Sequence, residues 1–191
     1  MTWKQFCELE GNVPLWYQNV SHKNLRIPKS ADGEDYQHLA ELFIANPCNL
    51  ILRGPPGRGK THFTYSLIRG LFDSGRARLG DIRFYKSKSF DDRIMDELQR
   101  YKSCTHFIKS VCEIPFFFLD DFGVERDTER ANRDYYDFLD TRLYNLKTTV
   151  ISTNLTEKAI TDHYGDRVYS RFKEYFWIDF DGPDLRGGKR L

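Results

Sequence analysis

Eight consecutive residues, Gly54-Pro-Pro-Gly-Arg-Gly-Lys-Thr61, have the types and spacing of a phosphate-binding loop. Its glycines let backbone N–H groups turn inward toward phosphate oxygens, and a helix that starts near Lys60 directs its positive end at the same anion. Lys60 would add a point charge at the β- and γ-phosphates, and the Thr61 hydroxyl would ligate Mg²⁺. The residues expected to bind ATP are therefore Gly54, Pro55, Pro56, Gly57, Arg58, Gly59, Lys60, Thr61 and His62.

A second pattern pairs an apolar run with two acids. Phe116-Phe-Phe-Leu119 is followed directly by Asp120 and Asp121. A buried strand that ends there projects both carboxylates at the carboxyl edge of the sheet, where ligands bind in such folds. We expect Asp120 to hold Mg²⁺ through water and Asp121 to act as the base that polarises an attacking water. The alternative is a strand followed by a polar turn, because Asp-Asp-Phe-Gly also suits a turn.

Three further residues are candidates for catalysis. Asn154 follows the apolar run Val150-Ile151 and would help Asp121 to orient water, or would simply cap the end of a strand. Arg167 and Arg171 lie four residues apart, on one face of an expected helix. They are either an arginine finger offered to the nucleotide of a neighbouring subunit or a solvated basic face that pairs with nearby acids.

A β-sheet would be needed to position these residues, and the hydrophobic pattern predicts one. Apolar runs predict strands at 49–53, 82–86, 116–119, 148–152 and 176–180. Between them, patterns with helical spacing predict helices at 35–45, 62–74, 90–101, 105–112, 128–145, 157–163 and 166–175. Strands that alternate with helices indicate an α/β fold with a parallel sheet covered on both faces.

The composition limits which kinds of binding site and which cellular location the chain can have. Lys and Arg total 29 against 28 Asp and Glu, a net charge of +1, so any nucleic-acid contact must come from a local patch. None of the four cysteines forms a C-x-x-C pair, which argues against a zinc ribbon or a thioredoxin-like site. No apolar run of 18 residues is present, and no signal-peptide core opens the chain, so we expect a cytoplasmic protein without a membrane span.

Taken together, the stretches GPPGRGKT, FFFLDDFG, VISTNL and GDRVYSRF resemble the AAA+ ATPases of the bacterial replicative-helicase loader type and the related ATPases that assist insertion-sequence transposases. The resemblance runs from about Val13 to Arg186. It implies a P-loop NTPase of the AAA+/ASCE class, a three-layer sandwich with a five-stranded parallel sheet. Asp120 and Asp121 would form Walker B, and Asn154 would be sensor 1.

The resemblance also implies roles for several basic residues. Arg171 matches the arginine finger most closely, with Arg167 beside it, and Arg186 falls where loaders have a sensor-2 arginine. The helix near 90–101 takes the place of the segment with which loaders contact single-stranded DNA. Candidate phosphate contacts there are Lys86, Arg93, Arg100 and Lys102, although a solvated helix face would look the same.

Two departures from the family pattern shape the expected domain organisation. The ATPase module begins within about fifteen residues, so we expect 1–17 to be an extension that contacts a partner and 18–191 to be the AAA+ domain. The chain stops soon after Arg186, which predicts an absent or minimal helical lid.

The resemblance implies an ATPase that is stimulated by DNA and by assembly through arginine fingers. It would bind ATP and Mg²⁺ and act on a replicative helicase and single-stranded DNA. A transposase helper, which would prefer duplex DNA, is the first alternative. A P-loop small-molecule kinase is the second, and a nucleotide-gated binding module with negligible turnover is the third. The sequence does not decide which protein is the partner, how many subunits assemble, or whether Arg167 or Arg171 is the arginine finger.

Overall fold

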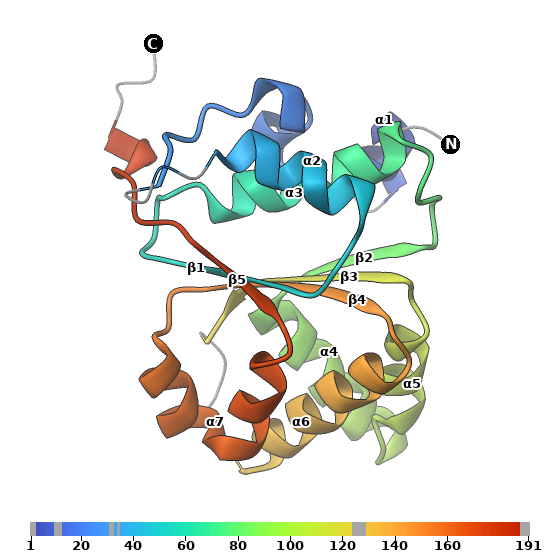
Figure 1. Cartoon of the computed structure of the whole chain (residues 1–191). Helices are drawn as coiled ribbons and strands as arrows, with labels where there is room; N and C mark the ends of the chain where they lie inside the picture. The colour runs from blue at the N-terminus through green and yellow to red at the C-terminus, as the bar shows by residue number, and fades with distance from the viewer. Residues whose placement is uncertain (1–2, 10–12, 31–32, 34, 124–128, 188–191) are drawn as a thin grey trace. The chain divides into compact units, whose positions relative to one another are not determined.

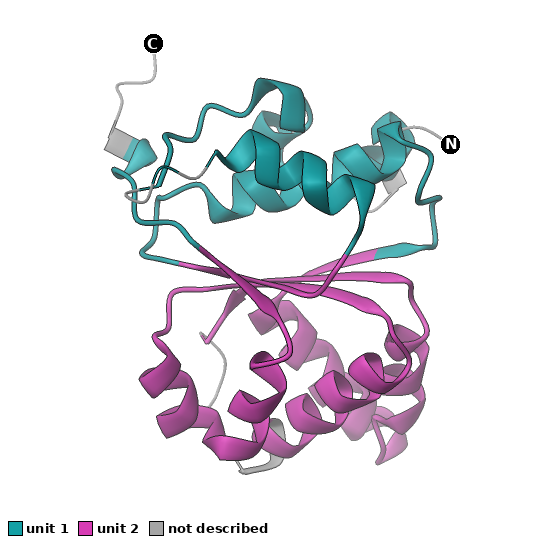
Figure 2. Cartoon of the chain, in the orientation of Figure 1, with its two compact units in different colours: residues 1–47, 54–82, 179–191 teal, residues 48–53, 83–178 magenta. Residues whose placement is uncertain are grey.

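The structure of the 191-residue chain is a computed structural model that describes residues 3–9, 13–30, 33, 35–123 and 129–187. The chain forms two compact units, coloured separately in Figure 2. Unit 1 comprises residues 1–47, 54–82 and 179–191, and unit 2 comprises residues 48–53 and 83–178. The phosphate-binding loop therefore belongs to unit 1, whereas both acids of the second pattern belong to unit 2.

Among the described residues, five parallel strands form one sheet in the order β2-β3-β4-β1-β5, as expected for an α/β fold (Figure 1). The strands are β1 Leu50–Arg53, β2 Ile82–Lys86, β3 Phe116–Phe122, β4 Thr148–Thr153 and β5 Phe176–Asp179. The central three, β3, β4 and β1, have their middle residues buried, as is typical of parallel strands, although β4 is rich in Thr and Ser. β4 pairs with β1 on one side and with β3 on the other, in parallel register.

Four helices pack with this sheet in unit 2, in the magenta part of Figure 2. They are α4 Ser87–Tyr101, α5 Thr105–Cys112, α6 Glu129–Tyr144 and α7 Glu157–Phe172. Their apolar faces meet in an aromatic core that includes Phe90, Phe117 and Phe138, with ring centroids 4.8–5.4 Å apart. The first residue of the helix predicted at 128–145, Thr128, lies outside the described residues.

The two helices predicted at the end of this unit are joined into one span, α7. Gly165 interrupts it with φ 79° and ψ 167°, so the helix direction breaks at that residue. Only glycine adopts this backbone conformation at little cost. The prediction of two helical segments was therefore correct in substance, and the break divides Glu157–Tyr164 from Asp166–Phe172.

Unit 1 is built around the helix that follows the phosphate-binding loop. Its elements are α1 Trp3–Leu9, η1 Leu15–Tyr17, η2 His22–Asn24, α2 Tyr36–Ala45, α3 Lys60–Asp73 and η3 Leu185–Gly187, where η marks short 3₁₀ helices. α2 begins where the Asp35 carboxylate accepts hydrogen bonds from the backbone N–H groups of Gln37 and His38. The α1 helix was not expected from the sequence. It forms because Trp3 and Phe6 stack together and pack on Phe72 of α3.

Within the described ranges, no helix combines the length and the apolar character needed to cross a bilayer.

Candidate functional site

The phosphate-binding loop of unit 1 connects β1 directly to α3, as the sequence predicts. Gly59 has φ 99° and caps α3, and its carbonyl accepts a hydrogen bond of 2.8 Å from the Phe63 N–H. Gly57 also has a positive φ, 82°. Left-handed residues in such a loop turn successive N–H groups toward one side, and the helix start adds its positive dipole end. The backbone of this loop therefore fits a phosphate group.

The glycines of the loop are required by close contacts as well as by backbone angles. A Cβ on Gly54 would lie 2.2 Å from the Phe180 carbonyl oxygen, and one on Gly57 would lie 2.0 Å from the Asp184 carboxylate. The Leu185 N–H donates to the Gly57 carbonyl at 2.9 Å. The C-terminal segment of unit 1 therefore lies directly against the loop, an arrangement that the sequence pattern did not indicate.

Lys60 is buried, and its ammonium lies across the loop rather than pointing away from it. It donates to the carbonyl oxygens of Gly54 and Pro55, the latter at 2.9 Å. These main-chain carbonyls hold the ammonium at the loop, where a lysine is suited to meet a phosphate oxygen. Thr61 follows it in the first turn of α3.

Arg186 is placed beside the same loop by its neighbours in η3. Its N–H donates to Asp184 Oδ1 at 2.9 Å, and the preceding residue is the one that is hydrogen-bonded to Gly57. Arg58, within the loop, donates to the Gly182 carbonyl. These contacts hold the Arg186 backbone beside the loop, and a role of its side chain at the phosphates stays a prediction.

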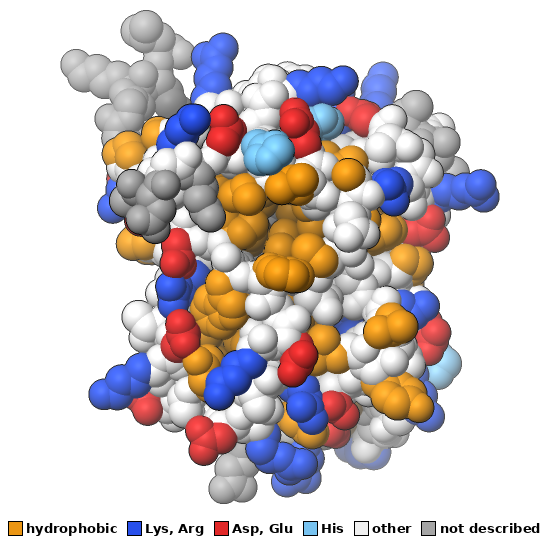
Figure 3. All heavy atoms as spheres, in the orientation of Figure 1, with side chains coloured by type: hydrophobic (Ala, Val, Ile, Leu, Met, Phe, Trp, Pro, Cys, Tyr) orange, Lys and Arg blue, Asp and Glu red, His pale blue; other side chains and the backbone are white. Residues whose placement is uncertain are grey.

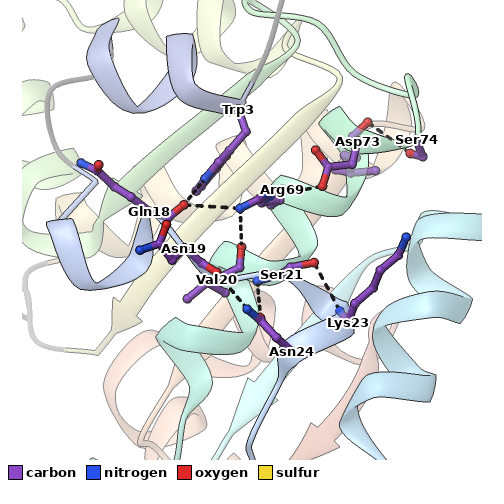
Figure 4. A network of polar contacts seen from close by, with 11 residues as sticks. Trp3, Gln18, Asn19, Val20, Ser21, Lys23, Asn24, Arg69, Asp73 and Ser74 are labelled. Atoms are coloured by element: carbon purple, nitrogen blue, oxygen red, sulfur yellow. Dashed lines mark hydrogen bonds and ion pairs between the residues drawn. The ribbon is translucent and has the colours of Figure 1, made fainter.

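The N-terminal segment packs on the other predicted nucleotide contact, His62. Tyr17 stacks on Tyr65 with centroids 4.7 Å apart and meets the His62 ring edge-on at 5.9 Å. Burial lowers the pKa of His62 below its ordinary value. Figure 4 shows the polar contacts that fix this segment to α3, where Trp3 Nε1 and Arg69 both donate to the Gln18 carbonyl.

In unit 2 the two acids of the second pattern lie inside β3 rather than after it. Leu119 pairs with Ile151 and Phe122 with Thr153, so Asp120 and Asp121 together oppose the single residue Ser152. This is a β-bulge, a distortion that re-aims side chains and is frequent beside active sites. Asp121 accordingly has φ 59°, a left-handed angle that is uncommon outside glycine and is a sign of a functional constraint.

Ser152 connects both acids and was not identified as a site residue from the sequence. Its hydroxyl donates to Asp120 Oδ1 at 2.5 Å and accepts from the Asp121 N–H at 2.9 Å. Asp120 is almost fully buried, whereas Asp121 is half-buried. The buried carboxylate is thus fixed in orientation and the second remains accessible to water, which suits a metal ligand beside a general base.

Asn154 directly follows β4 and is exposed. The turn around it is fixed by its neighbours, because Thr153 Oγ1 donates to the Phe122 carbonyl at 2.8 Å and accepts from the Leu155 N–H at 3.1 Å. Asn154 therefore lies at the same carboxyl edge of unit 2 as the bulge, which is where a residue that orients water must be.

Arg167 and Arg171 lie on the second half of α7, after the break at Gly165. Both guanidinium groups stack on one ring, with Arg167 Cζ 4.5 Å and Arg171 Cζ 5.1 Å from the centroid of Tyr136 on α6. Arg171 also pairs with Asp140, Nε to Oδ1 at 2.7 Å. These contacts raise the pKa of Arg171 further, although burial opposes its charge. The acid that pairs with Arg171 thus lies on another helix, α6, rather than beside it in the sequence.

The candidate DNA contacts of α4 differ among themselves. Arg93 is engaged within the helix, paired with Glu97 at 2.7 Å and stacked over Phe107. Lys86, Arg100 and Lys102 are exposed. On the face drawn in Figure 3, basic side chains alternate with acidic ones instead of gathering into one field.

Metal binding would depend on few protein ligands. Within the described residues, no group of three or more His, Cys, Asp or Glu side chains could hold a metal ion. Mg²⁺ commonly takes one or two protein oxygens and keeps phosphate and water for the rest. Asp120 and the Thr61 hydroxyl are the right chemical types for that sparse role.

A family model for IstB-like ATP binding proteins matches residues 14–171. The chain belongs to this family. Its members are ATP-binding proteins, as the P-loop indicates. Among curated relatives, YdaV of Escherichia coli K12 is 23% identical over 92% of this chain and 71% of its own. A putative ATP-binding protein in an insertion sequence of Mycobacterium tuberculosis is 27% identical, over 74% of this chain and 57% of that protein.

Solved structures share the fold of this family member. The crystal structure of the DnaC helicase loader superposes with a TM-score of 0.75 at 23% identity, over 87% of this chain and 99% of that one. The replication initiator DnaA bound to AMPPCP and single-stranded DNA gives 0.72 at 17% identity, over 87% of this chain and 51% of that one. At these identities the likeness shows the fold alone.

Proposed function

We propose that this family member is an ATPase that assists DNA replication by loading or remodelling a replicative helicase on single-stranded DNA. The observation that carries the proposal is the Ser152-bridged pair of acids at the carboxyl edge of β3, together with the P-loop. Hydrolysis needs a base that reaches water, and Asp121 is held half-buried in a strained conformation beside the buried Asp120. A module that only binds ATP has no need of such a base.

The roles of the residues follow from their chemistry. Lys60 and the α3 N-terminus bind the phosphates. Thr61 and Asp120 are the residues that would hold Mg²⁺, which would supply positive charge to stabilise those phosphates. Asp121 accepts the proton of the attacking water, and Asn154 orients that water. Arg186, in the segment that lies against the loop, contacts the γ-phosphate. Arg171, with Arg167 beside it, reaches the nucleotide of a neighbouring subunit and completes the site there.

A DNA contact on α4 fits the same account. The exposed Lys86, Arg100 and Lys102 would bind the phosphates of a single strand, and Arg93, which is paired with Glu97, would contribute less. Two of the solved proteins that share the fold are a helicase loader and an initiator bound to single-stranded DNA, and they support this choice of partners.

The test compares ATP hydrolysis without DNA, with single-stranded DNA and with duplex DNA of equal length. We expect stimulation by the single strand, and we expect its loss in a Lys86→Ala, Arg100→Ala, Lys102→Ala triple variant that still binds ATP. A control with Lys4→Ala, Lys23→Ala and Lys29→Ala removes three exposed lysines elsewhere. Equal rates with and without DNA would contradict the proposal.

A role as an ATPase helper of a DNA transposase is the second candidate. The family description and the insertion-sequence relative favour it. Stronger stimulation by duplex DNA than by single strands, together with retention of a transposase rather than a replicative helicase in the presence of ATP, would establish it over the loader role.

A further inference from the structure

The two arginines in the second half of α7, Arg167 and Arg171, both contact side chains of α6. Helices α6 and α7 lie side by side in unit 2 (Figure 1). The face of α6 that meets Arg171 carries Tyr136 and, one turn later, Asp140. Residues four apart on a helix share one face, so the ring and the carboxylate meet the same guanidinium.

Arg171 is held through one edge of its planar group. Nη2 donates to the Tyr136 hydroxyl at 2.8 Å, and Nε pairs with Asp140 at 2.7 Å, while the plane stacks over the Tyr136 ring. Within the described part of the chain, these contacts use Nε and Nη2, which leaves Nη1 for an outside acceptor. About 30% of the side chain is exposed. The charge is therefore oriented and still within reach of solvent.

Arg167 completes the arrangement from the preceding turn. It is exposed, and its guanidinium lies over the same Tyr136 ring, 4.5 Å from the centroid. The pair of arginines thus shares one aromatic platform despite their like charge. A surface pocket of about 500 Å³ opens beside this platform, and Arg133, Asp137 and Arg167 are among the residues that line it.

Orientation matters for a group that must act across a subunit boundary. A free arginine side chain loses rotamer entropy when it is fixed in one orientation. Contacts that orient the guanidinium before the partner arrives remove that cost from the transition state, where preorganised charge contributes most.

We propose that Tyr136 and Asp140 are positioning residues that preorganise Arg171 for its action on a neighbouring subunit's nucleotide. The inference rests on the proposed function, because it requires Arg171 to be the finger. Neither residue touches the nucleotide; both act through the arginine.

The experiment measures assembly-dependent ATP hydrolysis by Asp140→Asn, which keeps the shape of the side chain and removes its charge. We expect kcat to fall about tenfold, with KM, the ATP dissociation constant and the melting temperature nearly unchanged. Asp137→Asn makes the same change three residues earlier on α6 and should leave kcat within about twofold. Tyr136→Phe keeps the ring and removes the hydroxyl, so it should lower kcat less than Tyr136→Leu.

Mixing two variants distinguishes a loss of Arg171 positioning from damage to the variant subunit's own nucleotide site. Lys60→Ala cannot bind ATP but still offers an intact Arg171. Added to Asp140→Asn, it should restore hydrolysis at the variant's own nucleotide, because only the supplied arginine was at fault. Failure of this rescue would overturn the proposal, and so would full activity of both Asp140→Asn and Tyr136→Leu when Arg171→Ala is inactive. Full activity of Arg171→Ala would instead overturn the finger assignment, and the positioning role with it.

Discussion

Replacing Ser152 with alanine should weaken both the fold and the chemistry of unit 2. The Ser152 hydroxyl donates to the buried Asp120 carboxylate and accepts from the Asp121 N–H. A hydrogen bond to a charged group contributes about 1.5–3 kcal/mol and a neutral one about 0.5–1.5 kcal/mol. We therefore expect Ser152→Ala to lower the free energy of unfolding by about 2–4 kcal/mol. For a chain of this size the melting temperature would fall by roughly 5–15 °C.

Chemical denaturation and ATPase assays at 25 °C test this prediction together. Without the bridge, the strained Asp121 loses its support, so kcat should fall by about tenfold or more while ATP still binds. Ser110→Ala is the matched control, because its hydroxyl donates only to the Phe107 carbonyl of its own helix. If Ser152→Ala unfolded and hydrolysed ATP like Ser110→Ala, the bridge would have no role in stability or catalysis.

Three further predictions concern other parts of the chain. Arg142 is fully buried and donates to Thr149 Oγ1 and to the carbonyls of Val111, Ile114 and Thr148, and burial lowers its pKa to about 10. Arg142→Met should lower the free energy of unfolding, measured by urea denaturation, by about 3–5 kcal/mol, because several buried carbonyls lose their hydrogen-bond donor. A decrease of less than about 1 kcal/mol would contradict this prediction. Gly54→Ala should abolish binding of a fluorescent ATP analogue, because the added methyl group would clash with the Phe180 carbonyl. Gly75→Ala is the control, since Gly75 also has a positive φ, 72°, but has open space around it. This variant should bind the analogue normally and lower the free energy of unfolding by about 1 kcal/mol. Burial lowers the pKa of His62 and of His22 from 6.5, so the unfolded chain binds more protons in acid. The free energy of unfolding should then be highest above about pH 6.5 and fall below it, less steeply in His62→Gln than in wild type; equal slopes of the two proteins would refute it.

Much of this architecture could be predicted from the sequence because its signals are local. An apolar run leading into Gly54–Thr61 predicts strand, loop and helix together, and the structure has all three. The expected strand at 116–119 was shorter than the observed β3, since a bulge that accommodates Asp120 and Asp121 within a strand depends on the register with β4.

The residues that were missed act through contacts distant in sequence. Ser152 meets Asp120 from another strand, and Asp140 meets Arg171 from another helix. Arg142 looks like any basic residue on an amphipathic helix until its burial against backbone carbonyls is seen. The αL angle of Asp121 likewise follows from pairing with β4 rather than from residue type.

The central claim is that the chain both binds and hydrolyses ATP, with separate residues for each step. The most direct measurement compares Lys60→Ala and Asp121→Asn for equilibrium ATP binding and for single-turnover hydrolysis in the presence of Mg²⁺ and single-stranded DNA. We expect Lys60→Ala to lose binding, and Asp121→Asn to bind ATP with nearly normal affinity while hydrolysis falls at least 100-fold. Normal hydrolysis by Asp121→Asn would contradict the account.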